Sequence, residues 1–199
     1  MLINPLALIF NSKRQWEELA KAPSSQLWSF IPYLIVMALI PCAAWYYGTT
    51  EVGWVIGDGD LTKLTNASAG KIALAMYIAT LLSVVAIGYS VHWMAATYGS
   101  DSSIIKGIAL TALTTTPFYL LGLTGLHPLF WMDFILGILG VCWSVYLLYS
   151  GIPVVMNIPK DRGFLFASAL LAVSLVIFLV LLGATAMLWD MGALPVFVD

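Results

Sequence analysis

Five long stretches of this 199-residue chain contain no Asp, Glu, Lys or Arg. They hold 29, 29, 26, 26 and 27 residues and lie between Lys21 and Glu51, Lys71 and Asp101, Lys106 and Asp133, Asp133 and Lys160, and Arg162 and Asp190. A helix needs about 20 mostly apolar residues to cross a bilayer. The pattern therefore predicts an all-α fold, a polytopic membrane helix bundle with five transmembrane helices.

Composition supports this interpretation. Charged residues make up 9% of the chain and hydrophobic residues 61%, whereas a soluble domain has about 25% charged residues. The net charge is −2, and the cations are scattered along the chain. We therefore expect membrane lipids as partners and no nucleic acid.

The apolar windows and the breaker residues between them predict where each span begins and ends. The expected spans are 27–47, 71–96, 104–121, 129–150 and 164–189. The expected connections are 48–70, 97–103, 122–128 and 151–163. Pro153 and Pro159 should prevent a regular helix through the last of these. Its apolar residues should pack against the helix ends.

The first 26 residues form a separate amphipathic segment. Asn4 and Pro5 are typical of a helix start. One side then carries Leu6, Ile9, Phe10, Trp16 and Leu19, and the other carries Lys13, Arg14, Glu17, Glu18 and Lys21. Two interpretations are open, a helix lying in the membrane interface and a helix packed on the bundle itself. We expect an interfacial helix over 1–26 and a five-span domain over 27–199.

The distribution of cations predicts the orientation. With five spans, one side of the membrane would hold Lys13, Arg14, Lys21, Lys106, Lys160 and Arg162, and the other only Lys63 and Lys71. Cytoplasmic loops carry an excess of Lys and Arg. We therefore expect a cytoplasmic N-terminus and a C-terminus on the outer side.

Two ionisable residues in or near the spans are candidate functional positions. An ionisable group inside a membrane is a functional hypothesis by default. The ring of His92 could serve in a site or simply reach interfacial water. The carboxylate of Asp133 could complement the dipole and cap the free amides at the start of the fourth span, or could form a cation or proton site.

The third span contains a run of hydroxyl residues before a proline. Thr114, Thr115 and Thr116 precede Pro117, which should bend the helix, and the hydroxyls can satisfy nearby backbone carbonyls. These four positions are further candidates, as is Asn157 in the last connection. Because the three threonines cover about 200° of the helix, they cannot all face one polar path.

Small residues repeat every four positions on the second span, at Ala75, Ala79 and Ser83, with Ala86 and Ser90 on a neighbouring stripe. Such faces let membrane helices approach closely, so a homo-oligomer is possible through them. The sequence identifies no protein partner.

Catalytic motifs are absent from the sequence, which has no HExxH, GxSxG or P-loop pattern. Its two histidines and two cysteines are dispersed. We expect no enzymatic activity, no cofactor and no metal.

Several segments together resemble the bacterial branch of the Yip family of small five-span membrane proteins. They are Asn4-Pro5 through Phe10 with Trp16-Glu17-Glu18, Gly48-Thr49-Thr50 with Gly53-Trp54 and Gly57-Asp58-Gly59, Thr116 to Gly122 with His127-Pro128-Leu129, and Gly151-Ile152-Pro153 with Asn157 to Lys160. The resemblance implies a bacterial inner-membrane location. Since eukaryotic members take part in vesicle traffic, it also implies a role in membrane organisation or traffic.

Two functions are consistent with the sequence. The first is a non-enzymatic membrane protein that acts through protein or lipid contacts. It is favoured by the small-residue faces and the N-terminal amphipathic segment. The second is a small channel or transporter for an ion or small solute, favoured by the proline-broken third span and by His92 and Asp133.

Overall fold

The computed structural model describes residues 8, 11–55, 59–192 and 194–198, so the expected helix start at Asn4 and Pro5 lies outside the described residues. The α-helices are α2 Ser12–Lys21, α3 Ser24–Leu27, α4 Phe30–Tyr47, α5 Asn66–Ala95, α6 Ile104–Thr114, α7 Thr116–Leu121, α8 Phe130–Val155 and α9 Lys160–Asp190. A π-helical turn covers Gly48–Val52, and 3-10 turns cover Ala96–Tyr98 and Gly122–Leu126. Within the described residues, strand-like pairing is limited to two isolated bridges, Trp54–Thr62 and Leu64–Phe197.

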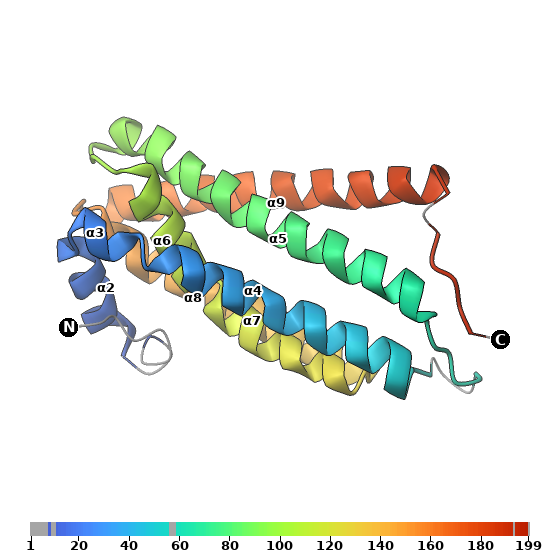
Figure 1. The fold of residues 1–199 in the computed structure, drawn as a ribbon. Coiled ribbons are helices and arrows are strands. Elements are labelled where there is room, and N and C mark those ends of the chain that lie inside the picture. The colour runs from blue at the N-terminus through green and yellow to red at the C-terminus, as the bar shows by residue number, and fades with distance from the viewer. Residues whose placement is uncertain (1–7, 9–10, 56–58, 193, 199) are drawn as a thin grey trace.

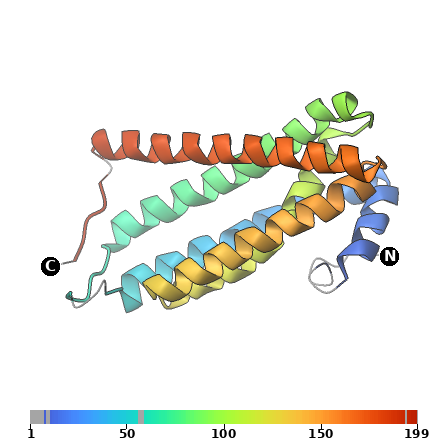
Figure 2. The same ribbon diagram turned by 180° about the vertical axis from the view of Figure 1, so that it is seen from behind.

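The long helices form one elongated bundle (Figure 1). Four helical segments are long and apolar enough to cross a membrane, and the α6–α7 pair is a fifth candidate bent by 42°. The expected all-α membrane fold with up to five spans is therefore confirmed. We call the end that carries α2 the α2 end. The other is the loop end, where the α4–α5 connection and residues 194–198 lie (Figures 1 and 2).

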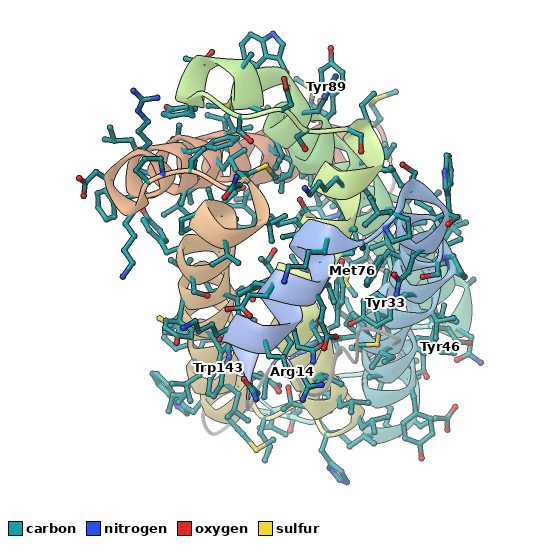
Figure 3. All side chains as sticks on the ribbon, turned by 90° about the vertical axis from the view of Figure 1, so that its left-hand side faces the viewer. Arg14, Tyr33, Tyr46, Met76, Tyr89 and Trp143 are labelled. Atoms are coloured by element: carbon teal, nitrogen blue, oxygen red, sulfur yellow. The ribbon has the colours of Figure 1, made fainter. Side chains whose placement is uncertain are left out.

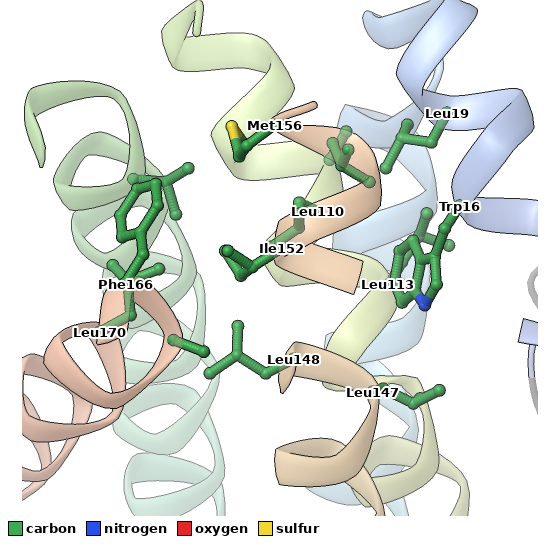
Figure 4. Packing of buried hydrophobic residues seen from close by; sticks show 14 of the residues in the cluster. Trp16, Leu19, Leu110, Leu113, Leu147, Leu148, Ile152, Met156, Phe166 and Leu170 are labelled. Carbon is green, nitrogen blue, oxygen red and sulfur yellow. The ribbon is translucent and has the colours of Figure 1, made fainter. Parts of the chain in front are cut away.

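The main core lies at the α2 end and is centred on Trp16. The apolar side of α2 packs mainly on α8, and the Trp16 and Leu19 side chains are fully buried there (Figure 4). The indole Nε1–H of Trp16 donates to Ser150 Oγ at 3.2 Å. A Cβ on Gly151 would come within 2.9 Å of the same ring, so only glycine leaves room for it.

Hydrogen bonds join several elements at this end. Lys106 Nζ donates to the Ala20 carbonyl at the end of α2, at 3.4 Å. Ser100 Oγ donates to the Met156 carbonyl at 2.7 Å. In the view from this end, α2 lies across the bundle between α8 and α4 (Figure 3). The amphipathic helix thus packs on the bundle. Its position at the membrane interface stays a prediction.

The crossing of α5 and α6 depends on two glycines. A Cβ on Gly107 would lie 2.1 Å from the Gly88 carbonyl oxygen, and a Cβ on Gly88 would lie 2.7 Å from the Ile108 backbone. Small residues at such positions let membrane helices approach until their backbones touch. The Ser103 hydroxyl caps α6 by accepting from the Lys106 N–H at 3.2 Å.

The end of α8 corrects one prediction. The fourth span was expected to stop at residue 150, but α8 continues through Pro153 to Val155. Proline removes one backbone hydrogen bond, and here its ring packs against Gly163 of α9, where a Cβ would be 2.7 Å away. The helix ends at Val155, and Asn157, two residues later, has a left-handed φ of 52°.

The remaining prediction about this connection is confirmed. Ile152, Val155, Met156 and Ile158 are all buried against the helix ends. The N–H of Ile158 donates to the Pro153 carbonyl at 3.1 Å and that of Asn157 to the Val154 carbonyl at 3.3 Å. This pair of bonds is the usual way to satisfy the last carbonyls of a helix.

The expected connection over 48–70 is also shorter than predicted. The backbone stays helical through Val52, and α5 begins at Asn66 rather than at Lys71. Thr65 caps α5, because its hydroxyl accepts from the Ser68 N–H at 3.4 Å. The first five residues of α5, Asn66 to Gly70, precede the uncharged window that begins after Lys71, so the window alone gave a late start.

The helix α9 separates from the bundle toward the loop end (Figures 1 and 2). Its buried residues, Gly163, Phe166, Ala167 and Leu170, are all in its first third. At the loop end the C-terminal segment returns to the α4–α5 connection, where Thr65 N–H donates to the Val196 carbonyl at 2.9 Å and Val198 N–H to the Lys63 carbonyl at 3.0 Å. A space between α9 and the other helices remains.

Candidate functional site: a membrane cavity at the loop end

The break between α6 and α7 forms one wall of this space. The hydroxyls of Thr114 and Thr115 both donate to the Thr111 carbonyl at 2.9 Å, and that of Thr116 donates to the Ala112 carbonyl at 3.3 Å. These hydroxyls hydrogen-bond to backbone carbonyls of the turn before Pro117, as expected from the sequence. The Tyr33 hydroxyl of α4 donates to Thr116 Oγ1 at 2.7 Å, because the Thr116 hydroxyl proton is already donated to the Ala112 carbonyl.

The three threonines do not share one environment. Thr114 and Thr116 are buried in the bundle, while Thr115 lines a cavity that opens between α9 and the other helices. Thus only Thr115 of the three threonines contributes to the cavity, and together they do not form a continuous polar path. Pro117 directs the chain so that Phe118, Tyr119 and Leu121 of α7 also line the cavity.

This loop-end cavity has a volume of about 490 Å³. Five helices contribute to its wall: α4, α5, α7, α8 and α9, with the 3-10 turn after α7. The lining is largely apolar. Its polar members are Thr80, Ser83, Thr115, Tyr119, Thr124, Asp133 and Thr185. The cavity therefore suits a mostly apolar occupant that carries a small polar group.

Asp133 is the charged residue in this lining. Its two carboxylate oxygens are buried and have no hydrogen-bond partner among the described residues. They do not cap α8, whose capping residue Leu129 lies four positions earlier. Of the two alternatives for Asp133, the capping of free amides is thus not seen among the described residues, although the first turn of a helix still favours negative charge through its dipole.

A second, smaller pocket adjoins the cavity on the other side of Asp133. Its volume is about 340 Å³, and it is lined by Trp45, Thr49, Trp54, Pro128, Phe130, Asp133 and Phe134. We call it the aromatic pocket. Trp45 and Asp133 belong to both linings, so these two side chains form the common wall.

Helical periodicity explains how α8 contributes to both spaces. Phe130, Asp133, Phe134 and Gly137 are spaced i, i+3, i+4 and i+7, and such positions lie on one helix face. The rings of Phe130 and Phe134 are stacked with centroids 6.4 Å apart. Gly137 lines the loop-end cavity, and a Cβ there would meet no atom within 4 Å.

The other candidates lie elsewhere. His92 is exposed near the α2 end of α5, and its Nδ1 is hydrogen-bonded to the Ser102 carbonyl. Asn157 lies just after α8, at the α2 end. Of the predicted positions, the structure brings Thr115 and Asp133 to one cavity and leaves His92 and Asn157 apart from it. Within the described residues, no three His, Cys, Asp or Glu side chains could hold a metal ion together.

Sequence reasoning missed the aromatic members of the pocket. Trp45 and Trp54 are far from Phe130 in sequence. They line one pocket because the end of α4, the α4–α5 connection and the start of α8 meet at the loop end. The spacing from Phe130 to Gly137 was the one available signal.

Comparison with known proteins agrees with the family resemblance. A family profile described as the Yip1 domain matches residues 6–182. The inner membrane protein YohC of Escherichia coli strain K12 is 35% identical over 160 residues, which cover 80% of this chain and 82% of that protein. YohC of Escherichia coli O6:H1 matches to the same extent. No solved structure matches this chain.

Proposed function

Because this chain belongs to the Yip1 domain family, we propose that it is a non-enzymatic inner-membrane protein that acts by holding a membrane lipid in the loop-end cavity. A role in membrane organisation or traffic follows from this proposal. The observation that carries it is the cavity of about 490 Å³ between membrane helices, whose lining is largely apolar. The inner-membrane location is supported by YohC, which is described as an inner membrane protein.

The α9 wall of the cavity favours a lipid as the occupant. Phe178 and Leu182 line the cavity and are still 57% and 51% exposed, so this side is open rather than sealed. In a bilayer an open apolar space fills with hydrocarbon, because an empty one would forgo dispersion contacts on every side. Lipid acyl chains are the hydrocarbon that a bilayer supplies.

The proposed orientation places this cavity in the outer half of the membrane. The α2 end carries the helix starts with Lys106, Lys160 and Arg162 as well as the cations of α2. Since cytoplasmic segments carry the excess of cations, the α2 end faces the cytoplasm in our proposal and the C-terminus is periplasmic. The lipid would then come from the outer leaflet.

The small-residue face of α5 belongs in part to this site. Ala79 and Ser83 line the loop-end cavity, while Ala75 and Ala86 are exposed. A homo-oligomer through the exposed part of this face is part of the proposal. A protein partner other than a second copy is not assigned.

A small channel or transporter is the second candidate, and the unpartnered Asp133 carboxylate is the observation that favours it. Against it, Val91, Ala95, Leu110 and Leu113 fill the bundle between this cavity and the α2 end. Flux of small cations into liposomes that contain the purified protein distinguishes the two. A selective flux that disappears on Asp133→Asn or His92→Ala would establish transport.

Photocrosslinking tests the lipid site directly. The purified protein is placed in nanodiscs with a photoactivatable diacyl lipid, and crosslinked residues are mapped by mass spectrometry. We expect labels on cavity residues of α5, α8 and α9. Gly137→Leu should reduce them severalfold, because its side chain enters the cavity without a clash.

The matched control is Gly183→Leu. A Cβ at Gly183 also meets no atom within 4 Å, but this exposed position of α9 is not part of the cavity lining. It should leave the labelling pattern unchanged. Labels spread evenly over the lipid-facing surface, with no response to Gly137→Leu, would refute the proposed lipid site.

A further inference from the structure

The geometry points to an organic ammonium group as the ligand of the aromatic pocket, held among the rings of Trp45, Trp54, Phe130 and Phe134. The Asp133 carboxylate, whose oxygens are covered in this structure, turns into the pocket to meet it. The inference rests on the proposed function where the ammonium is the headgroup of a bound lipid. A free, water-soluble amine would present the same chemistry. The experiment below separates these two sources.

The carboxylate needs a partner that the described residues do not provide. Both oxygens of Asp133 are buried without a hydrogen bond, and a buried charge without a partner is strongly unfavourable. Asp133 lies in the first turn of α8. An ammonium group supplies both the opposite charge and, where it carries protons, the missing donors.

The rest of the pocket selects an organic cation over a metal ion. Four of its seven lining residues are aromatic. Aromatic faces attract ammonium groups through the ring quadrupole, and cages of several rings are the usual site for quaternary ammonium ligands. A bare metal cation would need several oxygen ligands. The Thr49 hydroxyl already donates to the Trp45 carbonyl at 2.7 Å, so few oxygens remain.

The rings are held in place before any ligand arrives. Trp45 lies against Gly125, where a Cβ would come within 2.7 Å of the indole. Trp54 packs on Phe197 with ring centroids 6.2 Å apart. Phe130 and Phe134 stack on each other. A preformed site loses less entropy on binding, so these contacts favour binding of a ligand by the rings.

The shared wall links this pocket to the lipid cavity. Trp45 and Asp133 line both spaces. An ammonium group in the aromatic pocket therefore places whatever is attached to it beside the loop-end cavity. A phosphatidylethanolamine fits this arrangement, with its headgroup amine at Asp133 and an acyl chain along Gly137.

Two binding measurements on the full-length protein in nanodiscs test the inference. The first compares how well phosphatidylethanolamine and phosphatidylglycerol, each with the same chains, compete with the photoactivatable lipid. The second measures binding of tetramethylammonium and ethanolamine by tryptophan fluorescence. The uncharged carbon analogue of choline, 3,3-dimethylbutanol, serves as the neutral probe.

We expect an ammonium preference of about tenfold in at least one of these measurements, which is the scale of a desolvated cation–π and charge contact. A preference confined to the lipid identifies the headgroup as the source. A preference confined to the soluble probes identifies a free amine. Asp133→Asn should abolish either preference, and Trp45→Leu should weaken it, while Asp190→Asn at the exposed end of α9 should leave it intact.

The failures of the two proposals are distinguishable. If cavity labelling responds to Gly137→Leu but both lipids compete equally and no soluble ammonium binds, the lipid site stands and the ammonium site is wrong. If soluble ammonium binds while labelling ignores Gly137→Leu, the ammonium site stands alone. Equal binding of 3,3-dimethylbutanol, or a preference that survives both Asp133→Asn and Trp45→Leu, would also overturn the ammonium site.

Discussion

The two ends of this bundle are built differently. At the α2 end, α2, α5, α6, α8 and α9 converge on a continuous core around Trp16, Ile152 and Phe166. At the loop end, α9 separates from its neighbours and leaves a cavity of about 490 Å³ beside an unpartnered carboxylate. The main core and the proposed ligand site therefore lie at opposite ends of the same helices.

Glycines also differ in how closely they are packed, although not according to the end of the bundle. At Gly107 and Gly151 a Cβ would lie 2.1 Å and 2.9 Å from atoms of other elements. At Gly137 and Gly183 it would meet nothing within 4 Å. Glycine also allows close packing at the loop end, where a Cβ on Gly48 would lie 1.8 Å from the Gly125 carbonyl oxygen. Gly137 and Gly183 instead leave space that another molecule can occupy.

The largest expected effect concerns which end faces the cytoplasm. A reporter active only in the cytoplasm, fused after residue 199, should give no signal, whereas the same reporter fused before residue 1 should be fully active. The reason is the excess of cations at the α2 end. A cytoplasmic C-terminus would contradict the five-span topology and would place the cavity in the inner half of the membrane.

The second prediction tests the α2-end core. Trp16→Ala should lower the free energy of unfolding by about 3–5 kcal/mol, because it removes a fully buried aromatic side chain and leaves a cavity. SDS titration in mixed micelles, followed by circular dichroism, measures the change. Trp93→Ala is the control, since Trp93 is 69% exposed at the same end. Equal effects of the two substitutions would mean that the core is not where stability resides.

The third prediction compares alanine substitutions at two glycines, which should have different effects on the free energy of unfolding. Gly107→Ala should destabilise by about 1–3 kcal/mol, because its methyl group collides with the Gly88 carbonyl and forces α5 and α6 apart. Gly137→Ala should be neutral or stabilise by up to about 1 kcal/mol, because alanine favours the helix and nothing obstructs its methyl group. The same titration measures both. Destabilisation by Gly137→Ala would show that the loop end is packed after all.

The sequence predicted the α2 end and the spans better than it predicted the site. The uncharged windows located the spans, and Thr114 to Pro117 located the bend of the third, because length, charge and proline act locally. The end of α8 was placed too early, since the effect of Pro153 depends on Gly163, which lies on the next helix. Local patterns cannot reveal such a contact.

The candidate site required tertiary information for the same reason. Asp133 could be identified as an unusual charge, but its two alternatives could not be separated from sequence. The proposed ligand site rests instead on the absence of a hydrogen bond to its carboxylate among the described residues, together with rings from α4 and from the α4–α5 connection. No sequence pattern indicates that those rings lie beside Asp133.

The smallest expected effect lies at the loop end, where the C-terminal segment returns to the bundle. Phe197→Ala should lower the free energy of unfolding by no more than about 1 kcal/mol, since a half-exposed aromatic pair contributes little. The ring is 49% exposed, and the backbone bonds of Val196 and Val198 to the α4–α5 connection do not need it. Val198→Ala, at a side chain 56% exposed, is the control. Because Phe197 packs on Trp54, its loss should weaken ammonium binding more than it weakens the fold. A loss of stability comparable to that of Trp16→Ala would instead show that the loop end contains a second structural core, and would contradict the contrast between the two ends.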